Sequence, residues 1–287
     1  ERVPSGEVDF LDTNHSVLLR QSIELAFREI LNVDRITCIS RVEGKQYFAF
    51  SKVTSSISLV SRPVNAALFA EDLASIRLLF DTLDAGASPD DLRRRLNSWN
   101  IDLLQKTLYS MTMAFCCAID LQKSGDRKTP GTFFEYFVAY MFSRRLRINP
   151  VRRVEITSHG TRISLPTDFI FDPGPKYRKF HVPAKTSTRE RIIQVWAHQR
   201  VIDGTLGQGR FLGTPVILTE TKLDKKKLEV IEICLPLQWQ IYQAHISQLT
   251  RIYYLDVPQP YVMLNDVVPP INVRPFAEFF LESESFV

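Results

Sequence analysis

The spacing of apolar residues predicts that the first part of the chain is mainly helical. Apolar residues recur at helical intervals over 15–31, 65–83 and 101–121, and the last of these runs is apolar on most sides, as in a buried helix. Residues 46–60 are richer in Phe, Val, Ser and Ile, which favours two short strands. The run Ser88-Pro89-Asp90-Asp91 has the serine cap, the proline and the acids that begin a helix.

The pattern changes after the loop at 124–131, and helices then alternate with extended runs. Helices are predicted over 132–146, 188–201 and 238–249, and strands over 151–157, 165–171, 179–184, 214–219, 228–235 and 251–257. This alternation predicts an α/β (α+β) fold with a central mixed β-sheet flanked by helices. We expect a mainly helical region over 1–125 and a second unit over 126–287, with a peripheral, proline-punctuated tail from 267 onwards.

Composition and net charge exclude fewer classes of function than the pattern of hydrophobic residues does. Hydrophobic residues make up 45% and charged residues 24% of the chain, which is typical of a globular protein. The net charge of +4 permits a polyanionic partner without requiring one, although basic residues are dense between Arg144 and Arg210. No apolar run approaches the ~20 residues that span a bilayer, so no membrane partner is expected. The four cysteines lack CxxC spacing and are expected to be reduced thiols in a cytoplasmic protein.

Asp168 and Lys185 are the first candidates for chemistry. Asp168 is a lone acid in an apolar extended run, and Lys185 ends the next extended run after a Pro173-Gly174-Pro175 turn. Two neighbouring strands joined in this way place both side chains at one edge of a sheet. Hydrolysis of a phosphodiester with Mg²⁺ needs such a lysine together with two carboxylates. The acid that often stands two places before the lysine is absent, because Pro183 occupies that position.

The segment that begins at the lysine carries a more specific signal. Lys185-Thr186-Ser187-Thr188-Arg189-Glu190-Arg191 resembles the Lys-x-x-x-Arg-(Asp/Glu)-Arg signature of PD-(D/E)xK restriction endonucleases that recognise CCGG or CC…GG sites. In that group the second metal carboxylate comes from an upstream helix, in a Gly-x-x-Phe-Glu context. Gly131-Thr132-Phe133-Phe134-Glu135 matches this context. The motifs cover roughly 131–200, and Thr167 departs from the family pattern because Pro166 stands one place early.

The resemblance implies a type II restriction endonuclease with a PD-(D/E)xK core over 126–287. Glu135 and Asp168 would bind Mg²⁺, and Lys185 would complete the catalytic set. Arg189, Glu190 and Arg191 would read G·C pairs, since arginine can donate twice to guanine and a carboxylate can accept from cytosine. The expected partner is double-stranded DNA, cut at a palindromic site by a homodimer or tetramer. The resemblance also implies that the protein lies in a bacterial or archaeal cytoplasm. A cognate methyltransferase would act on the same DNA site. Region 1–125 would serve dimerisation or an accessory DNA contact.

Several alternatives remain open at this stage. Glu220-Thr221-Lys222 also spells ExK but is rejected as the active site, because it lies beyond the predicted readout helix and leads into the basic run Lys225-Lys226-Lys227. Asp172 is the second candidate for a metal ligand after Asp168. Trp196 is interpreted as a core residue rather than a base-stacking one, and His181 and His198 show no metal-binding spacing. The competing functions are a structure-specific or repair nuclease of the same superfamily and a DNA-binding module that has lost its activity.

Overall fold

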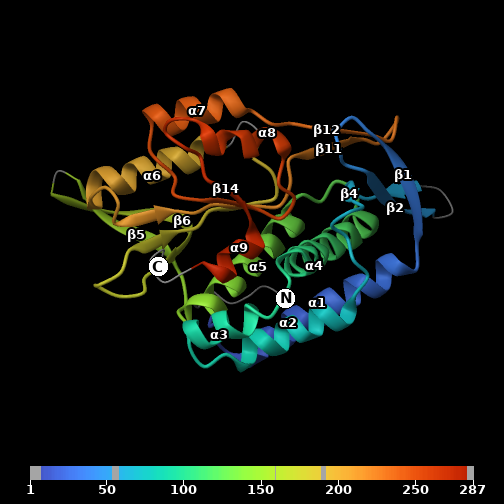
Figure 1. Ribbon diagram of the computed structural model, residues 1–287, viewed down its shortest axis with the longest axis horizontal. Helices are drawn as coiled ribbons and strands as arrows, with labels where there is room; N and C mark the ends of the chain where they lie inside the picture. Colours follow the sequence, from blue (N-terminus) through green and yellow to red (C-terminus); the bar gives the residue numbers. More distant parts are fainter. Residues whose placement is uncertain (1–7, 54–57, 159, 189–191, 283–287) are drawn as a thin grey trace.

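We describe the protein from a computed structural model, over residues 8–53, 58–158, 160–188 and 192–282. A mixed β-sheet lies between two groups of helices, and a smaller sheet lies at one end of the molecule (Figure 1). The predicted α/β fold with a central mixed sheet is therefore confirmed. In the described residues, no helix is sufficiently long and apolar to cross a membrane.

The central sheet is built from strands of the second half of the chain. It consists of two four-stranded parts that are joined end to end along the chain. One contains β5 (Val151–Ser158), β6 (Thr161–Phe171), β7 (Lys179–His181) and β9 (Phe211–Gly213), and the other contains β8 (Ala184–Lys185), β10 (Val216–Ile217), β13 (Ile252–Tyr254) and β14 (Val273–Pro275). Strands β5, β6 and β7 pair antiparallel, and β7 pairs parallel with β9. Strands β8, β10, β13 and β14 are parallel, in the order β14–β13–β10–β8. The sheet is therefore mixed, with antiparallel pairing in β5, β6 and β7 and parallel pairing in the rest.

Two prolines interrupt neighbouring strands of this sheet at matching places. Pro183 separates β7 from β8, and Pro215 separates β9 from β10. Proline has no N–H to donate to a strand ladder, so each interrupts the pattern of hydrogen bonds. Their carbonyls still accept, from Val216 N at 2.8 Å and from Tyr253 N at 2.9 Å. The strand pairing thus continues past Pro183 and carries the chain directly to Lys185.

Alternate residues of the strands face two different hydrophobic cores. Val216 and Tyr253 join one core, whereas Ile217 and Tyr254 join the other. The first core contains side chains of α4 (Ile101–Gln122), α5 (Lys128–Leu146) and α9 (Phe276–Leu281). The second contains side chains of α6 (Ile193–Leu206), α7 (Pro236–His245), α8 (Gln259–Val262) and the 3₁₀ turn Met263–Asp266. Helices therefore cover both faces of the sheet (Figure 1).

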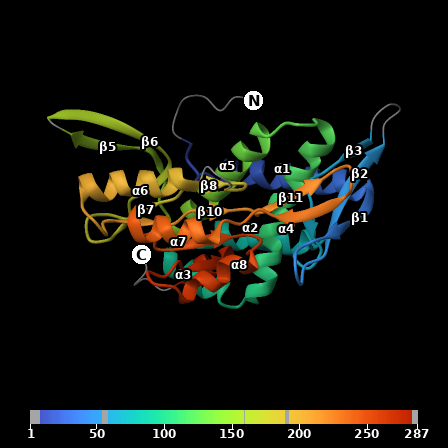
Figure 2. The same ribbon diagram turned by 90° about the horizontal axis from the view of Figure 1, so that it is seen from above.

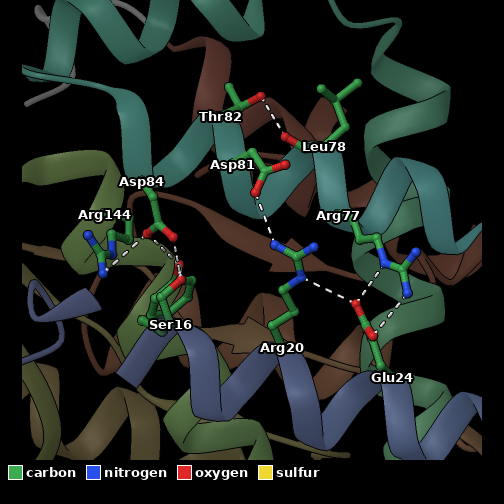
Figure 3. Close-up of polar contacts among 10 residues, drawn as sticks. Ser16, Arg20, Glu24, Arg77, Leu78, Asp81, Thr82, Asp84 and Arg144 are labelled. Atoms are coloured by element: carbon green, nitrogen blue, oxygen red, sulfur yellow. Dashed lines mark hydrogen bonds and ion pairs between the residues drawn. The ribbon is translucent and has the colours of Figure 1, made fainter. Parts of the chain in front are cut away.

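Helices α1 (Thr13–Leu31), α2 (Leu73–Ala85) and α3 (Pro89–Leu96) form a further layer on the side of α4 and α5. Ion pairs connect α1 to α2, as Figure 3 shows. Glu24 receives two hydrogen bonds from Arg77, at 2.9 and 3.1 Å. These bonds, with help from Arg20, lower the pKa of Glu24 to about 2. The predicted serine cap is present as well, since Ser88 accepts from Asp91 N at the start of α3.

The smaller sheet joins the two halves of the chain. It contains β1 (Asp34–Ser40), β2 (Tyr47–Val53), β3 (Ser58–Val60) and β4 (Val64–Asn65), together with β11 (Thr221–Asp224) and β12 (Glu229–Glu232). Parallel pairing of β1 with β12 brings the first and last parts together. The main core likewise contains residues from both sides of position 125, such as Phe27 and Phe276. The division into units 1–125 and 126–287, with a role in dimerisation or DNA contact for the first unit, stays a prediction.

Three expectations about individual elements were wrong. The stretch 271–281 is not peripheral, because Phe276, Phe279 and Phe280 are buried and Phe279 stacks on Phe142 of α5 at 4.0 Å between ring centroids. Helix α5 begins at Lys128, inside the predicted loop, because the carboxylate of Asp126 accepts from two backbone N–H groups at its start. Helix α2 begins at Leu73 rather than near 65, after an Asp72 cap.

Candidate active site

Asp168 and Lys185 meet across neighbouring strands, as their spacing predicted. Asp168 lies on β6, and Lys185 ends β8 just beyond the Pro183 interruption. The Asp168 Oδ2 atom accepts a hydrogen bond from Lys185 Nζ at 2.6 Å and another from Ala184 N at 2.9 Å. The two side chains are 23% and 32% exposed, so solvent and a ligand can reach this edge of the sheet. The backbone N–H of Ala184 fixes the carboxylate in place.

Glu135 joins the same cluster from the opposite layer. It lies on α5, which packs along β8, and its neighbours Phe134, Phe137 and Val138 are buried in the main core. These buried neighbours anchor the helix, so the Glu135 carboxylate faces the strand edge at 33% exposure. Asp168 and Lys185 both act on its charge. The three residues predicted from separate motifs are therefore brought together.

The negative charge of Glu135 lowers the stability of the folded protein. Burial raises the pKa of this carboxyl above its usual value, and repulsion by Asp168 raises it further. Lys185 and Arg152 oppose this shift without cancelling it. A raised pKa in the folded state means that the protein is destabilised by this group above that pKa, and that the destabilisation disappears as the pH falls. Two partly buried carboxylates that repel each other are the arrangement that a divalent cation stabilises.

We therefore expect Glu135→Gln to raise the thermal unfolding midpoint at pH 8 without Mg²⁺. The neutral amide removes both the burial cost and the repulsion from Asp168. Because the site is partly exposed, we expect a shift of roughly 2–4 °C, which about 1 kcal/mol produces in a chain of this size. The difference from the unaltered protein should shrink as the pH approaches 4.

Calorimetric scans between pH 4 and pH 8 provide the measurement for this prediction. The matched control is Glu155→Gln, at an exposed glutamate on the neighbouring strand β5, which should leave the midpoint unchanged. A Glu135→Gln protein that is equally or less stable at pH 8 would contradict the electrostatic description of the site.

Arg152 is a fourth member of the cluster that the sequence motifs did not identify. Its Nη2 atom lies 3.5 Å from Glu135 Oε2, and its guanidinium lies 4.9 Å from the centre of the Phe169 ring. Strand β5 positions it beside β6, in the hairpin that extends from the body of the protein (Figure 2). In the sequence, only its place in the Arg152-Arg153 pair of the basic region could have indicated Arg152 as a candidate. A guanidinium at this place has the charge and the donors to bind a phosphate oxygen.

The donor set fits Mg²⁺, which binds through one or two carboxylates and completes its octahedron with water and phosphate oxygens. Glu135 and Asp168 supply the two carboxylates, and Lys185 supplies the positive group. Within the described ranges, no group of three or more His, Cys, Asp or Glu side chains forms a metal-binding cluster. Two carboxylates leave most positions of an octahedral Mg²⁺ ion for water and substrate oxygens.

The remaining candidate residues lie in different surroundings. Arg189, Glu190 and Arg191 fall outside the described residues. Asp172 lies beyond the end of β6 and pairs with Lys179 at the start of β7. Glu220 is buried and accepts hydrogen bonds from Thr188 and Tyr254. The ExK glutamate thus has partners of its own.

Two aromatic candidates serve packing instead of catalysis or base contact. Trp196 is fully buried against Trp239, with 5.3 Å between ring centroids. His181 is also fully buried, and its Nδ1 shares a hydrogen bond with Gln199 Oε1 at 2.9 Å. Burial lowers the pKa of His181 to about 4, so the imidazole is neutral at neutral pH. It links β7 to α6 as an uncharged group next to the charged cluster.

Comparison with known proteins identifies one relevant solved structure. The crystal structure of the Type IIP restriction endonuclease Kpn2I is similar to this chain, with a TM-score of 0.74 and 27% sequence identity. The match covers 93% of this chain and 90% of that chain. No protein family model and no curated protein matches the chain. The protein thus has the fold of a restriction endonuclease over almost its whole length, which supports a type II restriction enzyme.

Proposed function

We propose that this protein is a Mg²⁺-dependent type II restriction endonuclease that cuts double-stranded DNA at a palindromic site containing CCGG or CC…GG. The observation that carries the proposal is the convergence of Glu135, Asp168 and Lys185 from three elements on one edge of a sheet. The likeness to Kpn2I along nearly the full chain supports the same class of activity.

The cluster accounts for phosphodiester hydrolysis in chemical terms. Glu135 and Asp168 would hold Mg²⁺, which when bound stabilises negative charge on the phosphate and on the leaving oxygen. Lys185 Nζ would orient the attacking water in line with the bond to the 3′-oxygen and would stabilise the charge that develops on phosphorus oxygens. The contact of Lys185 with Asp168 would hold the ammonium group beside the reacting phosphate. Breaking that bond leaves a 5′-phosphate and a 3′-hydroxyl.

Sequence recognition is assigned to Arg189, Glu190 and Arg191, directly after the catalytic lysine. Arginine can donate two hydrogen bonds to guanine O6 and N7, and the glutamate can accept from cytosine N4. A palindromic site has two equivalent halves, so two copies of the chain would each read one half. We therefore expect a homodimer, or a tetramer made of two such dimers, on DNA.

Replacing either arginine should relax specificity more than it weakens binding. We expect Arg189→Ala and Arg191→Ala each to lose about 1–3 kcal/mol of discrimination between the cognate site and a site with one changed G·C pair. The measurement is the ratio of kcat/KM for the two duplexes. Unchanged ratios in both variants would remove the readout assignment and leave the nuclease assignment intact.

Digestion of a large mixed DNA with Mg²⁺ tests the proposed function. Discrete fragments that disappear when EDTA replaces Mg²⁺ are the expected result. A smear, or cutting confined to junctions and damaged sites, would favour a structure-specific or repair nuclease. Binding to duplex DNA without cutting on any substrate would favour a DNA-binding module that has lost its activity.

A further inference from the structure

Glu220 lies buried beside the segment that connects Lys185 to positions 189–191. It follows β10, and its side chain is 1% exposed. Its two oxygens accept from Thr188 N, at 3.1 and 3.2 Å, and Oε1 also accepts from the Thr188 hydroxyl. The Tyr254 hydroxyl donates to the same oxygen at 3.0 Å. A single threonine thus uses both of its donors on one buried carboxylate.

A carboxylate is rarely buried so completely unless hydrogen bonds compensate for the lost water. Charge-assisted bonds of this kind are stronger than neutral ones, and they fix the geometry of the groups that make them. Thr188 is itself only 2% exposed, so water competes little for these bonds. The orientation of Thr188 is therefore set by Glu220.

Backbone hydrogen bonds fix the other end of the same short segment. Leu218 N donates to Lys185 O at 3.0 Å, and Thr219 N donates to Thr186 O at 3.4 Å. Residues 185–188 therefore lie along 217–220 and are attached at both ends. The catalytic lysine and the residue before position 189 belong to one supported stretch of chain.

We propose that Glu220 is a positioning residue for sequence recognition, which acts through Thr188 to fix where the readout residues begin relative to Lys185. The inference rests on the proposed function, in which residues 189–191 read the bases. It gives the buried glutamate of the ExK sequence a role in specificity instead of metal binding. Loss of the Glu220–Thr188 contact would release Thr188, the residue that precedes the readout residues, and would leave the contact between Asp168 and Lys185 in place.

Thr188→Val tests this inference, because valine has nearly the same shape and lacks the hydroxyl. We expect the ratio of kcat/KM between the cognate duplex and a duplex with one changed G·C pair to fall by on the order of tenfold to a hundredfold, as for a small displacement of a recognition group. Cutting of the cognate site should continue. Thr188→Ser keeps both donors and should retain the original ratio.

The matched control is Thr112→Val, which removes another buried hydroxyl, bonded to Leu108 O within α4 at 3.1 Å. If Thr188 serves stability alone, both valine variants should lower the unfolding midpoint and neither should change the discrimination ratio. That outcome overturns the inference. Glu220→Ala provides a second test, because it removes the acceptor of both Thr188 donors, and it should reduce discrimination at least as much as Thr188→Val.

Failure of the inference differs from failure of the proposed function. An unaltered protein that cuts at no defined sequence removes both. An unaltered protein that cuts at a defined site, with the same discrimination ratio in the Thr188→Val and Glu220→Ala variants, removes the positioning role alone.

Discussion

Lys185→Ala should reduce the rate of DNA cleavage by about 10²–10⁴-fold, the range for loss of a group that takes part in proton transfer or charge stabilisation at the reacting centre. The lysine ammonium lies 2.6 Å from Asp168 Oδ2, at the edge of the sheet where a phosphate would approach. Alanine removes this group and leaves both carboxylates. Single-turnover cleavage with saturating Mg²⁺ measures the loss, and binding of cognate duplex in Ca²⁺ should stay within a few-fold of the original.

The chain offers a close control for this substitution. Lys179, at the start of β7, also pairs with an aspartate, since it contacts Asp172 just beyond the end of β6. Its exposure, 30%, is close to the 32% of Lys185. Lys179→Ala should therefore affect stability in a similar way and leave cleavage nearly unchanged. Equal losses of cleavage in the two variants would mean that Lys185 acts through folding and not through chemistry.

Asp168→Asn should abolish cleavage, by on the order of 10³-fold or more, because a metal ion contributes several kcal/mol of charge stabilisation in such reactions. The amide keeps the shape of the side chain and an acceptor for Ala184 N, so the strand edge should stay folded. A second readout is independent of activity. Mg²⁺ binds the native state and should raise the unfolding midpoint of the unaltered protein, but not that of the variant.

The corresponding substitution at the second candidate ligand separates the two assignments. Asp172→Asn should retain both cleavage and the stabilisation by Mg²⁺, since the carboxylate of Asp172 pairs with Lys179. If Asp172→Asn loses the Mg²⁺ response and Asp168→Asn keeps it, the metal site has been assigned to the wrong carboxylate.

The sequence predicted correctly that Asp168 and Lys185 lie together at the edge of a sheet, but it placed some of the surrounding elements wrongly. The proximity of Asp168 and Lys185 could be predicted, because a strand, a turn and a second strand are local features that the residues of the sequence indicate clearly. Glu135 could be identified only through the resemblance to a known family, since no local sequence pattern connects a residue of α5 with the edge of a sheet. Arg152 was missed because its role depends on β5 lying beside β6, and that pairing brings it within reach of Glu135 on another layer.

Long-range packing explains the error at the C-terminal stretch. The C-terminal stretch has several prolines, and these suggested a surface tail. Its phenylalanines at helical spacing, Phe276, Phe279 and Phe280, instead form the buried face of α9 against α4 and α5. The partners of Glu220 could not be predicted either, because Thr188 and Tyr254 are distant from it in the chain.

The most direct test of the central claim is run-off sequencing of plasmid DNA cut by the protein in Mg²⁺. We expect every cut to lie within one palindromic sequence that contains CCGG or CC…GG, with 5′-phosphate and 3′-hydroxyl ends and no cutting in EDTA. Cuts at unrelated sequences, or cuts that persist without a divalent cation, would contradict the assignment of Glu135, Asp168 and Lys185 as the centre of a Mg²⁺-dependent, site-specific endonuclease.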